Sequence, residues 1–289
     1  MATSQSDQET YPLHSLPLPP IYITDPNVAN NCLSALPHGP IGFDLEWKPC
    51  YRKDQPQNRV ALIQLAAADC VLLLHICKMR EIPHKIRDVL NGSQWIKVGV
   101  NIQEDCKKLY RDYRLSVRNC VDLSLMARSV DNARWKGRYT NPIGLARLLQ
   151  TYHGTTLHKG RTQRSNWELP LSSTQQIYAA NDAHAGYTIY THLQTIAQTM
   201  TPPPHLDCYS FSCVSGQLYD RVNRFAWAPN NPNYDPGPPP PPKNKTPQRV
   251  KSQNAVPTTA DAAESLGELS MPPVGSVLRQ GISPKRRRR

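Results

Sequence analysis

The sequence predicts an α/β domain built on a mixed β-sheet, and three observations indicate this fold class. Apolar runs of strand length alternate with amphipathic helical segments through the middle of the chain. About three residues separate the second and third strands, which indicates an antiparallel hairpin, whereas helices separate the later strands. Only 5 of the 28 prolines lie in residues 41–201, which indicates that this stretch holds the folded unit.

The elements follow from their local patterns. Five strands rich in aliphatic side chains are expected at residues 40–47, 59–67, 70–76, 95–100 and 115–123. Five helices are expected around residues 80–90, 102–113, 124–129, 141–154 and 173–199. Asn101 with Glu104 has the spacing of a capping box, and Ser172 or Ser173 is expected to cap the last helix. The fourth helix has proline near its start and glycine at its end, as helices often do.

Composition divides the chain into four segments. We expect a disordered N-terminal tail over residues 1–20 and the folded domain over residues 21–201. Residues 202–236 carry enough aromatic side chains to pack on the domain or on a partner. Residues 237–289 read as a disordered, Pro-rich and basic tail. The net charge is +12, with ten Lys or Arg against three acids in residues 243–289, which favours a polyanionic partner.

The ends of the sequence suggest where the protein works. The first twenty residues lack the basic and apolar regions of a signal peptide, and no apolar run approaches the ~20 residues of a membrane span. We therefore expect a soluble protein in the nucleus or cytoplasm, neither secreted nor membrane-bound. The final "PKRRRR" favours nuclear targeting or nucleic-acid binding, although a solvated charge run remains an alternative. The proline run at 238–242 is either a ligand for SH3- or WW-type modules or a spacer.

The stretch Ile41–Trp47, "IGFDLEW", carries two acids inside an otherwise apolar strand. Side chains alternate across a strand, so Asp44 and Glu46 point to one face while Phe43 and Leu45 point to the other. Two like charges on one face of a core strand repel each other and lose water. A bound cation is the compensation that we expect.

Two other acids stand where they can reach this pair. Asp105 lies at the start of the helix that follows a strand, and such strand-to-helix junctions are common positions for ligand sites in α/β sheets. Asp182 lies on the last helix, with Tyr178 on the same face four residues before it. The helix is alanine-rich here, so it can pack close to the sheet and set both side chains beside Asp44 and Glu46. Clustered carboxylates prefer Mg²⁺ or Mn²⁺, and two such ions ~3.5–4 Å apart suit phosphodiester hydrolysis.

Three segments carry a family resemblance. "FDLEW", "VGVNIQEDCKKL" and "YAANDAHAGYTIY" resemble, in order, the three motifs of the DEDDy 3′–5′ exonucleases of the ribonuclease H-like superfamily. The likeness covers residues 39–193 and is strongest to the exonuclease domain of the Werner-syndrome helicase. It implies a ribonuclease H-like, five-stranded mixed sheet flanked by helices.

The resemblance also implies roles for single residues. Asp44, Glu46 and Asp182 would hold one metal ion, and Asp44, with Asp105 largely through water, would hold the other. Tyr178 and Glu46 would orient the attacking water. The implied reaction is hydrolysis from a free 3′ end of DNA or RNA, with release of nucleoside 5′-monophosphates.

Four further residues are candidates for nucleic-acid binding. Trp47 is a candidate base-stacking platform, with packing against the core as the alternative. Lys159, Arg161 and Arg164 precede the last helix and are candidates to hold the phosphate backbone, with a solvated loop as the alternative. Two other functions stay open: a non-catalytic nucleic-acid-binding module of the same fold, and an interaction protein that acts through its tails.

Overall fold

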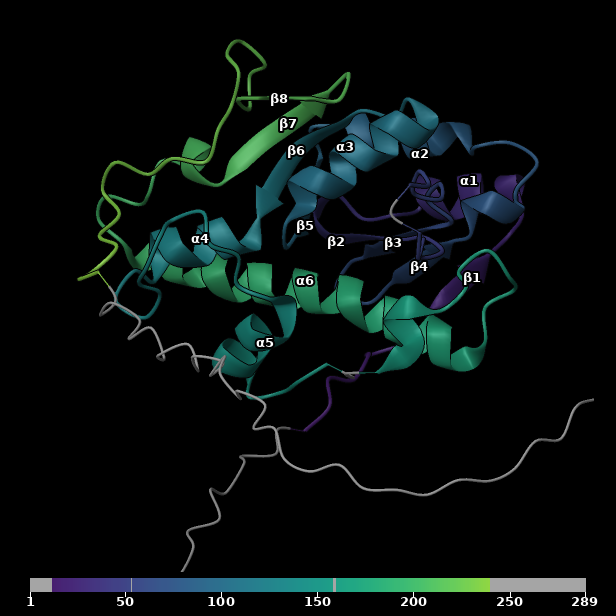
Figure 1. Cartoon of the computed structure of the whole chain (residues 1–289), viewed down its shortest axis with the longest axis horizontal. Helices are drawn as coiled ribbons and strands as arrows, with labels where there is room; N and C mark the ends of the chain where they lie inside the picture. Colours follow the sequence, from purple (N-terminus) through teal and green to yellow (C-terminus); the bar gives the residue numbers. More distant parts are fainter. Residues whose placement is uncertain (1–11, 53, 158–159, 240–289) are drawn as a thin grey trace, which may run out of the picture. The chain divides into compact units, whose positions relative to one another are not determined.

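An eight-stranded mixed sheet organises the described part of the chain (Figure 1). The computed structural model describes residues 12–52, 54–157 and 160–239. The strands are β1 (Ile21–Ile23), β2 (Gly39–Glu46), β3 (Leu62–Ala66), β4 (Val71–Leu74), β5 (Trp95–Gly99), β6 (Val117–Asp122), β7 (Ser210–Val214) and β8 (Gln217–Tyr219). The helices are α1 (Pro26–Ser34), α2 (His84–Asn91), α3 (Ile102–Tyr113), α4 (Leu123–Val130), α5 (Leu145–His153) and α6 (Ser173–Thr199).

The strand order is β1-β4-β3-β2-β5-β6-β7-β8, with parallel and antiparallel neighbours. β3 and β4 form the expected antiparallel hairpin, and β2 runs antiparallel to β3 but parallel to β5. The prediction of a mixed α/β fold is therefore confirmed, and the five predicted strands are β2 to β6. The expected number of strands was too small, because β1 adds a parallel edge beside β4 and β7 and β8 extend the other edge.

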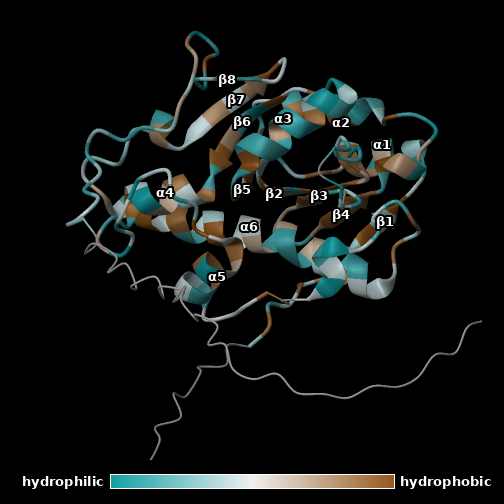
Figure 2. Cartoon of the chain, viewed as in Figure 1, coloured by the Kyte–Doolittle hydropathy of each residue, from teal (hydrophilic) through white to brown (hydrophobic). Residues whose placement is uncertain are grey.

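Helices cover both faces of the sheet. In Figure 1, α6 runs along one face with α4 and α5 on its side, and α1, α2 and α3 lie on the other. Both faces of β3 are buried, since Ile63 and Leu65 pack on one side and Leu62 and Ala66 on the other. In the hydropathy colouring of Figure 2 the apolar residues accordingly gather in the strands between the helical layers. This double burial explains why the central strands read as continuous apolar runs.

The contact between α6 and β2 is unusually close. A Cβ atom added at Gly42 would lie 1.8 Å from the backbone oxygen of Ala183, and a Cβ atom added at Gly186 would lie 3.8 Å from the Gly42 Cα. Glycine and alanine thus let the helix backbone rest almost directly on the strand. The close packing expected from the alanine-rich helix is confirmed, and it fixes how α6 presents its side chains to the end of β2.

Two helix starts differ from expectation in detail. α2 begins at His84, after Pro83, rather than at Arg80. α5 begins at Leu145 rather than near residue 141, because the Ser124 hydroxyl holds the Ile143 N–H at 2.7 Å and keeps the preceding segment on α4.

The capping predictions had opposite outcomes. Ser172 caps α6 in a full capping box with Gln175. The capping box predicted for Asn101 and Glu104 is wrong, because Asn101 adopts a left-handed conformation (φ 56°) and its side chain caps nothing. The Asn101 N–H instead donates to the buried carboxylate of Asp122 at 2.8 Å.

The flanking segments contribute to the fold. In the expected extension, β7 pairs with β6, and Trp227 stacks on Phe211 at 4.8 Å between ring centroids. Pro12 and His14 exchange backbone hydrogen bonds with Thr156, so the described residues from 12 onward are held, and the disorder expected over 1–20 is too broad there. Residues 1–11 and 240–289 of the predicted tails, including the basic terminus, lie outside the described residues. Within the described ranges, no helix combines the length and the apolarity needed to cross a membrane.

Candidate active site

A cavity of about 740 Å³ opens where β2 ends, between α3, α6 and the loop before α6. Phe43 to Trp47 form one wall, and Asp105 of α3 faces them from the side. Tyr178, Asp182 and Gly186 of α6 form the opposite wall. All five residues predicted to be catalytic line this one cavity: Asp44, Glu46, Asp105, Tyr178 and Asp182.

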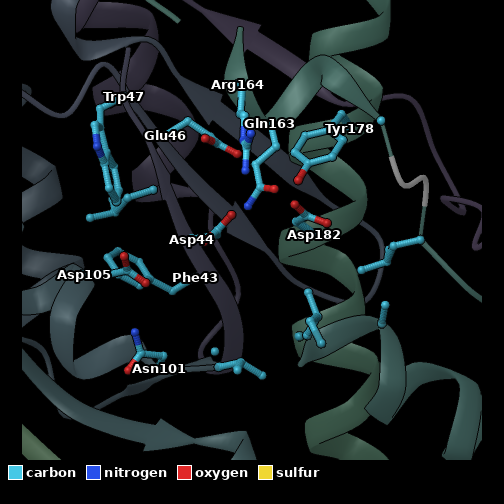
Figure 3. A pocket seen from close by; sticks show the side chains of 18 of the residues that line it. Phe43, Asp44, Glu46, Trp47, Asn101, Asp105, Gln163, Arg164, Tyr178 and Asp182 are labelled. Carbon is cyan, nitrogen blue, oxygen red and sulfur yellow. The ribbon is translucent and has the colours of Figure 1, made fainter. Parts of the chain in front are cut away.

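Three carboxylates converge inside the cavity. Asp44, Glu46 and Asp182 each offer an oxygen within 4.8 Å of the other two (Figure 3). The first two point the same way because they are two residues apart on β2, and the third reaches them because α6 rests on Gly42. Side-chain alternation and close packing together produce this cluster.

Asp105 and Tyr178 stand at different distances from the cluster. Figure 3 shows Asp105 apart from the other acids, on the α3 side of the cavity, and it is not a member of the three-carboxylate group. The Tyr178 hydroxyl lies toward Asp182 in the same view. The resemblance implies that Asp105 reaches a second ion, shared with Asp44, largely through water, and its place outside the three-carboxylate group agrees with such an indirect role.

The electrostatics of the cluster is unfavourable without a cation. Burial, reinforced by the neighbouring carboxylates, raises the pKa of Asp44 well above its ordinary value and that of Glu46 to about 10. Burial also raises the pKa of Asp182 to about 7, with a hydrogen bond from Tyr178 acting against the rise. The pKa of Asp105 rises to about 7 through burial and then through Glu104 and Asp122.

A divalent metal fits this set of donors. Across the described residues, no Lys, Arg or His forms a salt bridge with Asp44, Glu46 or Asp182. Carboxylate oxygens are the ligands that Mg²⁺ and Mn²⁺ prefer. The cavity thus gathers three carboxylates whose ionised forms no salt bridge within the described residues compensates.

Gln64 supports Asp44 from the neighbouring strand, and the sequence analysis missed it. It lies directly opposite Asp44 in the β2–β3 register and is fully buried. Both neighbouring groups of the Gln64 amide are acceptors of Asp44, so the amide nitrogen faces them. It donates to the Asp44 carboxylate at 2.9 Å and to the Asp44 carbonyl at 3.2 Å. These bonds fix the direction of the carboxylate. The signal was a polar residue inside the apolar run "ALIQLAA".

Asp122 is a second residue that the sequence analysis missed. It is 2% exposed at the end of β6, caps α4 through the Leu125 N–H and accepts the Asn101 N–H. One carboxylate therefore joins the starts of α3 and α4 and sets the direction from which α3 presents Asp105. The available signal was an acid near the end of a predicted strand, just before a predicted helix.

The predicted nucleic-acid-binding residues are placed differently from one another. Trp47 lines the cavity, and the Lys108 ammonium lies 4.7 Å from its ring centroid. Arg164 also lines the cavity, and Figure 3 shows it directed inward beside Gln163, a residue not predicted from sequence. Arg161 does not line the cavity and faces a shallow hollow next to the start of α6. Lys159 lies outside the described residues.

The sequence matches a known family over most of this domain. The family model described as 3′–5′ exonuclease matches residues 20–198. The mouse bifunctional 3′–5′ exonuclease/ATP-dependent helicase WRN is 35% identical over 162 residues, which cover 55% of this chain and 11% of that protein. An Arabidopsis thaliana 3′–5′ exonuclease is 33% identical over 164 residues, which cover 56% of this chain and 54% of that protein. The match therefore spans about half or less of these relatives.

Solved structures agree on the fold. The EXO domain of Aedes aegypti Nibbler superposes with a TM-score of 0.53 and 26% identity, covering 61% of this chain and 88% of that domain. Escherichia coli RNase D, described as an exoribonuclease involved in structured RNA processing, gives a TM-score of 0.51 at 22% identity and covers 62% of this chain and 45% of that chain. The ribonuclease H-like architecture implied by the three motifs is confirmed.

Proposed function

Since the chain belongs to the 3′–5′ exonuclease family, we propose that it removes nucleotides one at a time from the 3′ end of DNA or RNA with the help of divalent ions. One observation carries the proposal: the carboxylates of Asp44, Glu46 and Asp182 meet within 4.8 Å in an open cavity. The full set of acids argues against a module that binds nucleic acid without cutting it. Nucleoside 5′-monophosphates would be the products.

We assign different roles in this reaction to the residues of the cavity. Asp44, Glu46 and Asp182 would hold Mg²⁺ or Mn²⁺, and Asp105 would take part through water. The bound ions would supply an activated water and stabilise the charge that develops on the leaving 3′-oxygen. The Tyr178 hydroxyl is a poor base because burial and the nearby acids raise its pKa above the ordinary value, so it serves to orient the attacking water. Gln64 keeps the Asp44 carboxylate in place.

Direction of cutting is the first prediction. A 5′-labelled single strand is expected to shorten stepwise with time in Mn²⁺ or Mg²⁺, whereas a 3′-labelled strand is expected to release its label at once as a mononucleotide. Parallel digestions of single-stranded DNA, recessed duplex DNA and RNA identify the substrate class. A protein that slows the strand in a native gel but never shortens it would be the non-catalytic binder, and the proposal would be wrong.

The raised pKa values predict a link between pH, metal and stability. The pKa of an aspartate in an unfolded chain is about 3.9. In the folded protein the pKa values of Asp105 and Asp182 are raised to about 7. Between these values the folded state keeps protons that the unfolded state has released, so without metal the free energy of unfolding falls as pH rises from about 4 to about 7. Ionised carboxylates bind metal, so Mn²⁺ is expected to raise the melting temperature much more at about pH 8 than at about pH 5.

Thermal unfolding with EDTA or Mn²⁺ across this pH range checks the prediction. Asp44→Asn provides the comparison, because it removes one ligand and is expected to flatten the response to Mn²⁺. Equal stabilisation by Mn²⁺ at both ends of the range would contradict the electrostatic account of the cluster.

A further inference from the structure

A second groove begins next to the catalytic cavity. It measures about 1020 Å³ and runs past the segment before β3, the 3₁₀ turn Ile76–Lys78 that follows β4, and the loop before α6. Lys48 lines this groove while its neighbour Trp47 lines the cavity. Asn166 lines the groove two residues after Arg164, which lines the cavity. Two separate chain segments thus pass from one hollow directly into the other.

The groove is lined by more cations than acids. Its basic residues are Lys48, Arg59, Lys78 and Arg80, and its acids are Glu81 and Glu168. Two cations have acidic neighbours at 3.6 Å, Lys48 beside Glu168 and Arg80 beside Glu81, in pairs whose side chains are 40–75% exposed. Such exposed pairs contribute little and exchange readily for other anions. The Lys78 side chain makes no hydrogen bond or salt bridge within the described residues and is exposed.

One cation of the groove, the Arg59 guanidinium, is held against the ring of Tyr113. The Arg59 guanidinium lies 4.1 Å from the Tyr113 ring centroid and donates to the backbone oxygen of Asp112. The Tyr113 hydroxyl donates to the Val60 carbonyl at 2.7 Å, so the ring beneath the guanidinium is fixed too. Arg59 remains exposed. A planar cation of this kind offers a surface for base stacking as well as charge for a phosphate.

We propose that this groove binds the substrate strand on the 5′ side of the nucleotides in the catalytic cavity, with Lys48, Arg59, Lys78 and Arg80 facing its sugar–phosphate backbone. The proposal rests on the proposed function, since it needs a strand whose 3′ end lies among the acids. A single strand suits the site, because phosphate contacts and one stacking surface read no sequence. The groove would give longer strands an affinity that the cavity alone does not provide.

The double variant Lys78→Ala/Arg80→Ala tests the groove without disturbing the fold. Binding of 3′-blocked DNA and RNA strands is measured by fluorescence anisotropy in EDTA, so no cutting is needed. For strands of about twelve nucleotides we expect at least about fivefold weaker binding, and for trinucleotides no change. Each phosphate contact on a single strand contributes ~0.7 to the slope of log affinity against log salt, so the loss of two lowers the slope by about 1.4.

Arg221→Ala/Arg224→Ala is the matched control. It removes the same charge from exposed positions after β8, outside the groove and the cavity, and is expected to leave the difference between long and short strands intact. If the control variant binds long strands as weakly as the groove variant does, the loss of affinity comes from the lower net charge and not from the groove, and the proposal is overturned.

Cys77 provides a second measurement on the wild-type protein. It lines the groove and is the exposed member of the eight cysteines, whereas Cys32 on α1 is partly buried and lies outside it. A bound strand of about twelve nucleotides is expected to slow alkylation of Cys77 at least about fivefold and to leave Cys32 unchanged. Unprotected Cys77 together with unchanged binding by the groove variant would overturn the inference, even if wild-type protein digests strands normally. A wild-type protein that binds long strands through the groove but digests none would instead contradict the proposed function.

Discussion

Asp44→Asn is expected to abolish digestion, with a loss of at least about a thousandfold in rate. Asp44 belongs to the three-carboxylate cluster and is the acid that the family resemblance assigns to both metal ions. An amide keeps the shape and can still accept the hydrogen bond from Gln64, but it brings no charge to a cation. The change therefore removes the chemistry and keeps the packing.

Stability separates this result from simple misfolding. Without metal, Asp44→Asn should be at least as stable as the wild-type protein, because one of the mutually repelling carboxylates is gone. Asp88→Asn on α2 is the matched control, since its side chain is 59% exposed and forms a surface salt bridge with Lys85. Purified Asp44→Asn protein that digests strands at the wild-type rate would refute the assignment of the site.

Among the glycines that the structure describes, Gly42 is the one whose replacement by alanine is expected to destabilise the domain most. The new Cβ would lie 1.8 Å from the Ala183 oxygen, and that atom is backbone, so no side chain can turn away. We expect a loss of about 3 kcal/mol in the free energy of unfolding, or roughly 6–12 °C in melting temperature. Digestion should also fall, because α6 must move away from β2 and carry Asp182 with it.

Gly144→Ala is the control for this prediction. A Cβ at Gly144 meets no atom within 4 Å, and the backbone there has an ordinary φ of −63°. Melting temperatures and digestion rates are measured for both variants. The two variants add the same methyl group, at Gly42 against the backbone of α6 and at Gly144 in open space. Equal melting temperatures for Gly42→Ala and the wild-type protein would show that the helix does not rest on the strand as described.

The sequence was informative where a single local pattern determines the outcome. β2 to β6 were predictable because each is a sustained apolar run, and the acids because each lies in a recognisable motif at the expected place. β1 escaped because three residues, "IYI", carry no periodicity. β7 and β8 escaped because they follow a run of prolines in a segment that looked like an extension of the domain.

Supporting residues were harder to predict than the acids themselves. Gln64 and Asp122 act through partners distant in sequence, Asp44 on the neighbouring strand and the Asn101 backbone at the start of α3. The failed capping box shows the same limit: the spacing of Asn101 and Glu104 was suitable, but a buried carboxylate elsewhere had already taken the Asn101 N–H. Such choices depend on tertiary contacts that no local window contains.

The dependence of Asp182 on the seating of α6 has a consequence for how activity is acquired. α6 follows β2 to β6 in the sequence and packs on the sheet that they form. A partly folded or proteolytically nicked chain that has formed only β2 to β6 therefore lacks Asp182 in its place beside Asp44 and Glu46. Recovery of digestion after denaturation should then lag behind the recovery of secondary structure. The digestion rate would report the docking of α6 on β2 rather than the initial collapse of the chain.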